Sequence, residues 1–348
     1  MDSREIANNV KYHRYASGLT QQELAEKSGL SLPTIKNIEG AKTELRINTV
    51  RAVAEALSVG MELIIAPARV LSSVRFRSCK NMRSREGIIS FVAKKLDGFT
   101  MLEELLEKNV KPHYKSIKIG SPIETAYACR AFLGLGNMSP LPCIIDAITA
   151  LGIKLLGVSV NAEKFYGLSV GEKDGGPAII LNKGRTITSE QMIFAAAHEL
   201  GHILLHSSSY ETEESEVNWG QEDEADLFAS YFLVPEEGFN YHLARTGGLS
   251  FEESVIKVKQ IFGVGYKTIL HRLGGDFQTH MAELEKTTGS LAKGKELASL
   301  SKEIYTEARF RSLAVQAIKK GLISTLKGAE FLDVSPIEMS RLSLELAK

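Results

Sequence analysis

The most constraining stretch of this chain is FAAAHELGHILLH, at residues 194–206. It places His198, Glu199 and His202 in a run of Ala, Leu and Ile, where ionisable side chains are rarely buried. Residues four apart lie on one face of a helix, so a helix through this stretch presents both imidazoles to a single point. Buried ionisable groups need compensating partners, and a divalent cation between the imidazoles supplies one.

This HExxH spacing predicts that His198 and His202 are zinc ligands and that Glu199 is the catalytic base beside them. A chance match is the competing interpretation, but it would leave three polar side chains uncompensated in a buried helix. His206 continues the same row one turn further on. That is too far to bind the same ion, and we interpret His206 as structural.

The third zinc ligand is expected on a second helix, because catalytic zinc usually has three protein ligands and one open position. The segment QEDEADLFASYFLVP at 221–235 offers Glu222 and Glu224, which point to different faces. Asp226 follows Glu222 by four residues, so one face can hold a ligand and an acceptor for a ligand imidazole. This favours Glu222; Glu224, with Phe228 four residues on, remains the alternative.

These two helices and the preceding GPAIILNK run resemble the ImmA/IrrE family of metallopeptidases over roughly residues 140–240. The resemblance implies a zincin-like α+β domain that holds Zn²⁺ and cleaves a transcriptional repressor. Met192 and Ile193 stand where the family often has basic residues, which leaves the substrate cleft undefined. We consider Tyr210 and Tyr231 as oxyanion donors, and we expect a substrate peptide to lie along PAIILNK as an edge strand.

Two other function classes stay open. The metal domain could be a non-catalytic sensor of a repressor, or an antitoxin-like scaffold that binds a partner protein. The intact Glu199 favours hydrolysis, because a purely structural metal site needs no base.

Residues 1–66 predict a compact block of helices followed by a short strand at MELIIAP. Thr20 and Glu23 form a capping-box pattern, and Gly29 is a stop signal. A second short helix begins after Ser31 and ends at Gly40. Two short helices joined by a tight turn have the layout of a helix-turn-helix, whose second helix enters the major groove.

The string GLTQQELAEKSGLSLPTIKNIEG and the helix after it resemble the XRE/Cro family of helix-turn-helix regulators. The resemblance implies a five-helix domain that binds double-stranded operator DNA as a homodimer. Leu32 and Pro33 replace residues that are often polar base readers in the family. The helix faces give these candidates for DNA contact: Gln21 for phosphate, and Thr34, Lys36 and Asn37 for the groove. A helical bundle that binds no DNA is the alternative, since this block carries almost no net charge.

The whole chain predicts a multi-domain α+β protein. Its 348 residues suggest two or three domains, and 42 basic residues balance 42 acidic ones, so global charge predicts no partner. We assign residues 1–66 to the helix-turn-helix domain, 67–90 to a basic linker, 91–248 to the peptidase domain and 249–348 to a helical C-terminal region.

Composition and targeting signals favour the cytoplasm. The cysteines Cys79, Cys129 and Cys143 are far apart and odd in number, which fits neither a disulfide framework nor a cysteine-bound metal. The first residues do not resemble a signal peptide. No run reaches 18 apolar residues, so we expect no membrane association.

Overall fold

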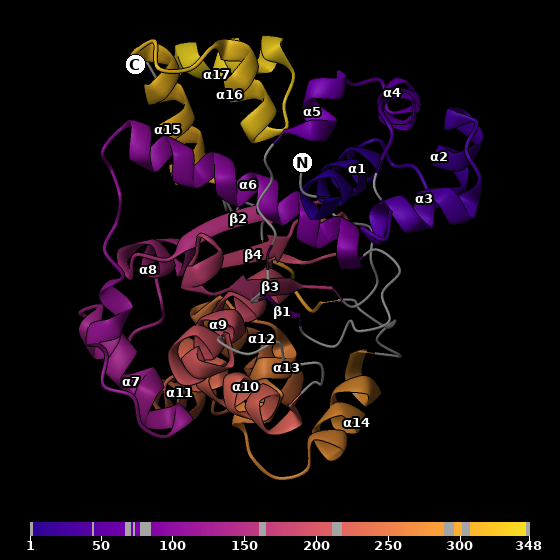
Figure 1. Ribbon diagram of the computed structural model, residues 1–348. Coiled ribbons are helices and arrows are strands. Elements are labelled where there is room, and N and C mark those ends of the chain that lie inside the picture. The colour runs from indigo at the N-terminus through magenta and orange to yellow at the C-terminus, as the bar shows by residue number, and fades with distance from the viewer. Residues whose placement is uncertain are drawn as a thin grey trace.

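The computed structural model describes residues 3–43, 45–66, 71, 74–76, 85–159, 165–210, 218–288, 296–300 and 307–345. Five helices near the N-terminus form a unit that we call the head (residues 3–65), and the remaining described residues form the body. In Figure 1 a small sheet crosses the middle of the body, with helices above and below it. This is the multi-domain α+β organisation that the sequence predicts. Among the described residues, no helix is long and apolar enough to cross a membrane.

The head follows its capping signals. The Thr20 hydroxyl accepts from the Glu23 amide while the Glu23 carboxylate accepts from the Thr20 amide, and Gly29 ends the helix in the left-handed conformation. The Ser31 hydroxyl caps the next helix through the Thr34 amide. Leu24 and Ile35 are fully buried where the two helices cross. The head helices are α1 (Ser3–Ala16), α2 (Gln21–Ser28), α3 (Leu32–Glu39), α4 (Ile47–Ala56) and α5 (Met61–Ile65).

The strand predicted at MELIIAP is wrong, because these residues form helix α5. Gly60 precedes the helix, and Ile64 is fully buried in the head core while Met61 and Ile65 pack against that core. Positions 61, 64 and 65 share one face of a helix, whereas a strand would turn them to opposite faces. A short apolar run does not distinguish the two structures by pattern alone.

The sheet of the body has four strands in the order β1-β3-β4-β2. The β2 and β4 strands run parallel, whereas β3 is antiparallel to both β4 and β1. Three strands fall on the predicted β-rich runs. The strands are β1 (Val74–Phe76), β2 (Lys154–Val158), β3 (Gly167–Val170) and β4 (Ala178–Asn182).

Two expectations about this region are wrong. The β4 strand, which contains the PAIILNK run, is a central strand with all five residues buried, so it cannot be an edge for a substrate peptide. The predicted basic linker at 67–90 contains β1, which pairs with β3, and helix α6 begins within it at Arg85. Much of that linker, including Cys79, lies outside the described residues.

Alternate residues of the strands face two separate cores. Leu155, Ile179 and Leu181 face the core that contains the HExxH helix α9. Leu156, Leu168 and Ile180 face the core formed with α6 and the last three helices. The helices that enclose the sheet are α6 (Arg85–Leu105), α7 (Pro122–Phe132), α8 (Ile144–Ala150), α9 (Ser189–Leu205), α10 (Trp219–Leu233), α11 (Glu236–Ala244), α12 (Phe251–Phe262), α13 (Tyr266–Arg272), α14 (Phe277–Thr288), α15 (Ala308–Lys319), α16 (Thr325–Leu332) and α17 (Pro336–Glu345).

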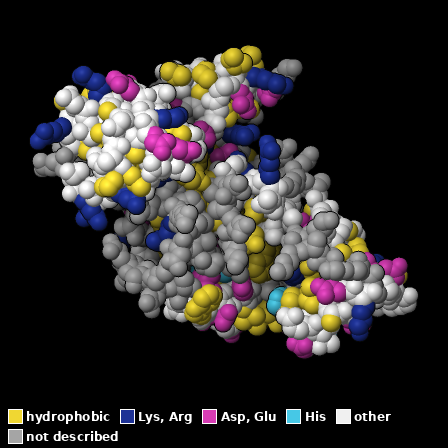
Figure 2. Space-filling model, turned by 90° about the vertical axis from the view of Figure 1, so that its right-hand side faces the viewer, with side chains coloured by type: hydrophobic (Ala, Val, Ile, Leu, Met, Phe, Trp, Pro, Cys, Tyr) yellow, Lys and Arg dark blue, Asp and Glu magenta, His cyan; other side chains and the backbone are white. Residues whose placement is uncertain are grey.

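The head rests on α6 through its first helix. The ring of Tyr12 stacks on Phe91 with centroids 5.7 Å apart, and the Lys94 ammonium lies 4.2 Å from the centroid of the Tyr12 ring. The opposite side of the head, with α2 and α3, projects away from the sheet (Figure 1). Figure 2 shows Lys and Arg side chains on the upper part of that view, where the head lies.

Candidate metal centre

Helix α9 carries the HExxH residues and is fixed at its start by a capping box. The Thr188 hydroxyl accepts from the Gln191 amide, and the Gln191 side chain accepts from the Thr188 amide. Gly201 sets how closely α10 approaches, because an added Cβ would lie 3.0 Å from a ring carbon of Phe228 and 3.2 Å from Cα of Ala225. This close packing brings the first turn of α10 alongside the two histidines.

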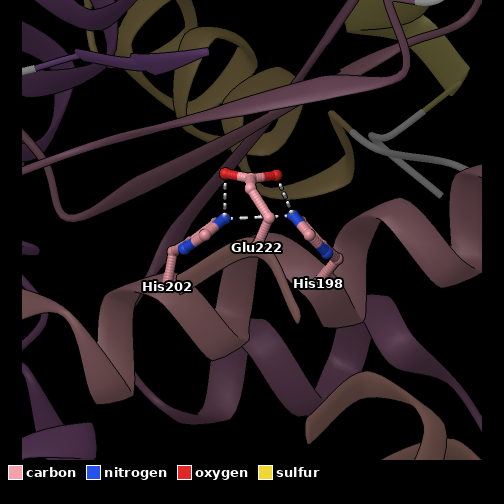
Figure 3. A group of neighbouring side chains, drawn as sticks. All are labelled: His198, His202 and Glu222. Carbon is pink, nitrogen blue, oxygen red and sulfur yellow. Dashed lines mark hydrogen bonds and ion pairs between the residues drawn. The ribbon is translucent and has the colours of Figure 1, made fainter. Parts of the chain in front are cut away.

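Three donor groups converge between α9 and α10 (Figure 3). The Nε2 atoms of His198 and His202 are 3.0 Å apart. Glu222 presents Oε2 at 3.4 Å from His198 and Oε1 at 3.3 Å from His202. Both imidazoles are almost fully buried, and one donor atom from each of the three residues falls within 4.8 Å of the others.

This donor set fits a zinc ion. With metal–ligand bonds of ~2.0–2.1 Å, neighbouring donors in a tetrahedral site are about 3.3 Å apart. The two imidazole nitrogens are 3.0 Å apart, near this value, and each of them has a different oxygen of Glu222 at 3.4 or 3.3 Å. Two imidazoles and one carboxylate are also a common ligand set of catalytic zinc, which leaves the fourth position open.

The Glu222 carboxylate is held in its ionised form. Burial alone would raise the pKa of Glu222, but hydrogen bonds and charge from His198 and His202 outweigh burial and hold the pKa well below its usual range. An ionised carboxylate is the form that binds a cation.

The outer nitrogen of His198 is paired with an acid one helical turn beyond Glu222. The Nδ1 atom of His198 lies 2.6 Å from Oδ1 of Asp226, whose side chain is 41 % exposed. An N–H at Nδ1 that donates to this carboxylate leaves the lone pair at Nε2, the atom that faces Glu222.

The outer nitrogen of His202 is paired through a second histidine. His202 Nδ1 lies 3.0 Å from His206 Nδ1, and His206 Nε2 lies 2.8 Å from Oε2 of Glu224. If the Nε2 hydrogen of His206 donates to Glu224, its Nδ1 accepts from His202. Each imidazole that faces Glu222 is therefore backed by an acid, directly for His198 and through His206 for His202.

Glu199 points to the sheet. Its Oε2 accepts a short hydrogen bond from the Ser169 hydroxyl on β3, and Ser169 in turn accepts from the Tyr210 hydroxyl at 2.7 Å. All three side chains are buried. Residues of α9 that follow one another point about 100° apart, so Glu199 lies beside the imidazole pair instead of within it.

The structure places the remaining sequence candidates as follows. Glu222, and not Glu224, joins the two imidazoles, while Glu224 contacts His206. The Tyr210 hydroxyl is engaged with Ser169, and the Tyr231 ring stacks under the Arg272 guanidinium at 3.6 Å. Ser169 is a site residue that the sequence does not single out, because it lies thirty residues before Glu199 in a short strand. Only the alternation of side chains along β3 could have indicated that it faces α9.

The candidate DNA contacts lie on α2 and α3 of the head. Lys36 and Asn37 are exposed on α3, and Thr34 is half-buried beside its cap. The Gln21 side chain donates to Glu39 at 2.7 Å, and the Arg14 guanidinium holds the same carboxylate. The side-chain amide of Gln21 is therefore directed at the head itself.

Two family matches agree with this arrangement. Residues 149–274 match the peptidase M78 family, an IrrE N-terminal-like domain, and residues 10–64 match a helix-turn-helix family. The first match includes α9 and α10 and continues through α12 and α13, beyond residue 248. Those two helices share the core of α9.

Comparison with whole proteins adds little. No curated protein sequence matches the chain. The crystal structure of ComR from Streptococcus suis matches at 10 % sequence identity over 100 % of this chain and 94 % of that chain, with a TM-score of 0.18. That score is too low to support any conclusion about the fold.

The head belongs to a class of DNA-binding domains, and the body belongs to a peptidase family. The chain therefore has the domain organisation of a regulator. The chain combines an XRE-type helix-turn-helix domain with an IrrE-like metallopeptidase-family domain.

Proposed function

We propose that this chain is a DNA-binding transcriptional regulator whose body is a zinc metallo-endopeptidase. Its substrate is a regulatory protein in the cytoplasm, either a repressor or the chain itself. The observation that carries this proposal is the convergence of His198, His202 and Glu222, with the buried Glu199 beside them. A metal site that only stabilises a fold has no need of this additional carboxylate.

A bound zinc ion would supply Lewis acidity at the scissile carbonyl and a water of lowered pKa. His198, His202 and Glu222 hold the ion, and Asp226 and His206 fix the ring orientation of the two histidines. Glu199 takes a proton from the attacking water and later delivers it to the leaving amine. Ser169 restrains the Glu199 carboxylate through the hydrogen bond at Oε2.

The head supports binding to double-stranded operator DNA. Lys36 and Asn37 are exposed on α3, the helix that enters the major groove in this class of domain. Because each head presents one such helix, two chains that bind as a homodimer read two half-sites.

The direct test of the enzymatic proposal is Glu199→Gln. We expect the variant to retain one zinc per chain and its DNA affinity, but to lose cleavage of the regulator encoded next to its gene. Zinc is measured by metal analysis, and cleavage by mass spectrometry of the co-expressed pair. The exposed Glu237→Gln on α11 is the matched control.

Two results would contradict peptidase activity. Stoichiometric zinc without cleavage in the unmodified protein points to a metal sensor. A stable complex with the neighbouring gene product that Glu199→Gln leaves unchanged points to an antitoxin-like scaffold.

Selection of binding sites from random DNA tests the head separately. We expect Asn37→Ala to relax base preference at one position, by ~1–3 kcal/mol for a paired base contact. Lys36→Ala tests whether that lysine reads a base or contacts the phosphate backbone. A uniform loss across sequences indicates the backbone.

A further inference from the structure

A cavity of about 620 Å³ lies between α9, α10 and α13. Asp226 lines one side of it, and this is the carboxylate that accepts from His198. The residues that face the metal position, His198, His202 and Glu222, do not line it. The cavity is therefore a separate site that adjoins the metal centre through Asp226, and its size is in the range of small-molecule pockets.

An unusual group of charges lies at one end of the cavity. Glu190 and Glu296 line this end, and they share a single buried cation, Lys259, whose Nζ lies 3.2 Å from Glu190 and 3.1 Å from Glu296. All three side chains are at least nine-tenths buried. Buried carboxylates need neutralising partners, so one lysine for two carboxylates leaves a negative charge in excess.

One oxygen of this pair has no hydrogen-bond partner among the described residues. Glu190 Oε1 accepts from Lys259 and from the Leu300 amide, whereas Glu190 Oε2 is buried without a hydrogen-bond partner. This oxygen is enclosed by protein, so the part of the pair that a ligand can reach is Glu296, whose side chain is 9 % exposed. Gly265 leaves the neighbouring carboxylate uncovered, because an added Cβ would lie 3.1 Å from Oε2 of Glu296.

The walls of the cavity suit a cation with an apolar body. Tyr166, Tyr231 and Tyr266 line it. The guanidinium of Arg272 already stacks over the Tyr231 ring at 3.6 Å from the centroid, so the rings of Tyr166 and Tyr266 are the walls left for a ligand.

Among the described residues that line the cavity, carboxylates outnumber cations. The fixed cations on its lining are Lys267 and Arg272, both from α13. His271 adds little positive charge at neutral pH, because burial lowers its pKa more than Asp226 raises it. Even with Lys259 included, three cations face four carboxylates. The carboxylates are Glu190, Asp223, Asp226 and Glu296.

We propose that this cavity binds an organic cation, a primary ammonium or guanidinium on a short apolar chain. The charged end lies against Glu190 and Glu296, and the chain lies along the tyrosine walls. The same chemistry occurs in a free amine and in a basic side chain of a peptide. Binding is independent of proteolysis, so the site can be present whether or not the body is an enzyme.

The test is calorimetric titration of the zinc-loaded full chain with agmatine and with putrescine. The neutral N-butylurea, similar in length to agmatine, is the control ligand. We expect saturable binding of at least one amine, with one site per chain, weakening as salt is raised. N-butylurea is expected not to bind. A capped Ala-Arg-Ala peptide distinguishes the sources: tighter binding than agmatine assigns the site to a peptide side chain, and weaker binding assigns it to a free amine.

Two variants test the location. Glu296→Gln is expected to weaken amine binding at least about tenfold. Because Glu296 also contacts Lys259, its loss can affect folding, so Ser230→Lys on the α10 wall provides a second variant that places a cation inside the cavity. We expect Ser230→Lys to abolish binding while thermal unfolding stays near that of the unmodified protein. Glu237→Gln, an exposed residue that does not line the cavity, is the control.

The proposal is overturned if neither the amines nor the peptide saturates the protein at millimolar concentration, or if N-butylurea binds equally well. It is also overturned if folded Glu296→Gln and Ser230→Lys both retain the original affinity.

Discussion

The head and the metal centre are stabilised in different ways. In the head, α2 and α3 begin at local caps such as the Thr20–Glu23 capping box, and an apolar core is joined by one buried carboxylate, Glu39, which pairs with Arg14. In the metal centre, His198, Glu199 and Glu222 are charged or polar groups buried by elements distant in the sequence. The head therefore takes much of its structure from local signals, whereas the proposed metal centre would need an ion to offset its buried charges.

Removing a metal ligand is expected to have the largest effect. His202→Ala should reduce bound zinc from one per chain to almost none. The body would then lose roughly 4 kcal/mol of stabilisation, the value for free zinc about 1,000-fold above its Kd. Metal analysis and calorimetry measure both effects, and the exposed His113→Ala is the control. A variant that keeps its zinc, or that loses DNA binding as well, would break the contrast between the two regions.

The second-largest effect is expected from acidification, which should weaken the contact between the head and the body. Burial lowers the pKa of His13 from 6.5 to about 4; the charge of Lys94 adds to this lowering, and Glu330 opposes it. Among the described residues, Nε2 of His13 is buried without a hydrogen-bond partner. The folded state prefers neutral His13, so no stability is lost above pH 6.5. As pH falls from 6.5 through 4 the unfolded chain takes up the proton first, and up to about 3 kcal/mol is lost.

Denaturant midpoints of metal-free protein between pH 7 and pH 4 measure this loss, since zinc binding is then excluded from the comparison. His13→Gln should flatten the difference, whereas His113→Gln should leave it intact. Equal pH profiles for His13→Gln and the unmodified protein would show that folding does not shift the pKa of His13.

The two acids behind the histidines should have unequal effects on zinc affinity. Asp226→Asn removes a direct partner of His198 and is expected to weaken zinc binding ~10–100-fold. Glu224→Gln acts on His202 only through His206, so its effect should be smaller, below about tenfold. Competition with a chelator measures both, and a larger loss for Glu224→Gln would reverse this order.

The smallest effect is expected from a helix cap in the head. Thr20→Ala should reduce the stability of the head by ~1 kcal/mol, because it leaves the Glu23 amide without its acceptor. Zinc content should not change. Thermal unfolding measures the loss, with the exposed Thr43→Ala as the control. A change in zinc content would mean that the two regions are coupled through more than the α1–α6 contact.

The contrast between local signals and contacts of distant elements explains what could be predicted from the sequence. Periodicity and capping predict α2, α3 and α9, and the i to i+4 relation between Glu222 and Asp226 anticipates that both face His198. The relay from His202 through His206 to Glu224 could not be foreseen, because it depends on the depth to which α10 packs on α9 over Gly201.

The order of the strands in the sheet could not be predicted from the sequence pattern either. The residues of β4 read as a buried strand, but they do not specify which strands pair with it on either side. The Ser169 contact with Glu199 requires knowing that β3 is antiparallel beside β4 under α9. The α5 segment shows the same limit for a five-residue apolar run, which a strand or a helix fits equally well.

The position of β1 determines how the body can be isolated. A fragment that begins after residue 90 would lack Val74–Phe76 and leave one side of β3 bare, because β1 pairs with that side in the described part of the chain. Unpaired strand backbone recruits other chains, so such a fragment is expected to self-associate. One that starts ahead of Val74 keeps that side of the sheet closed.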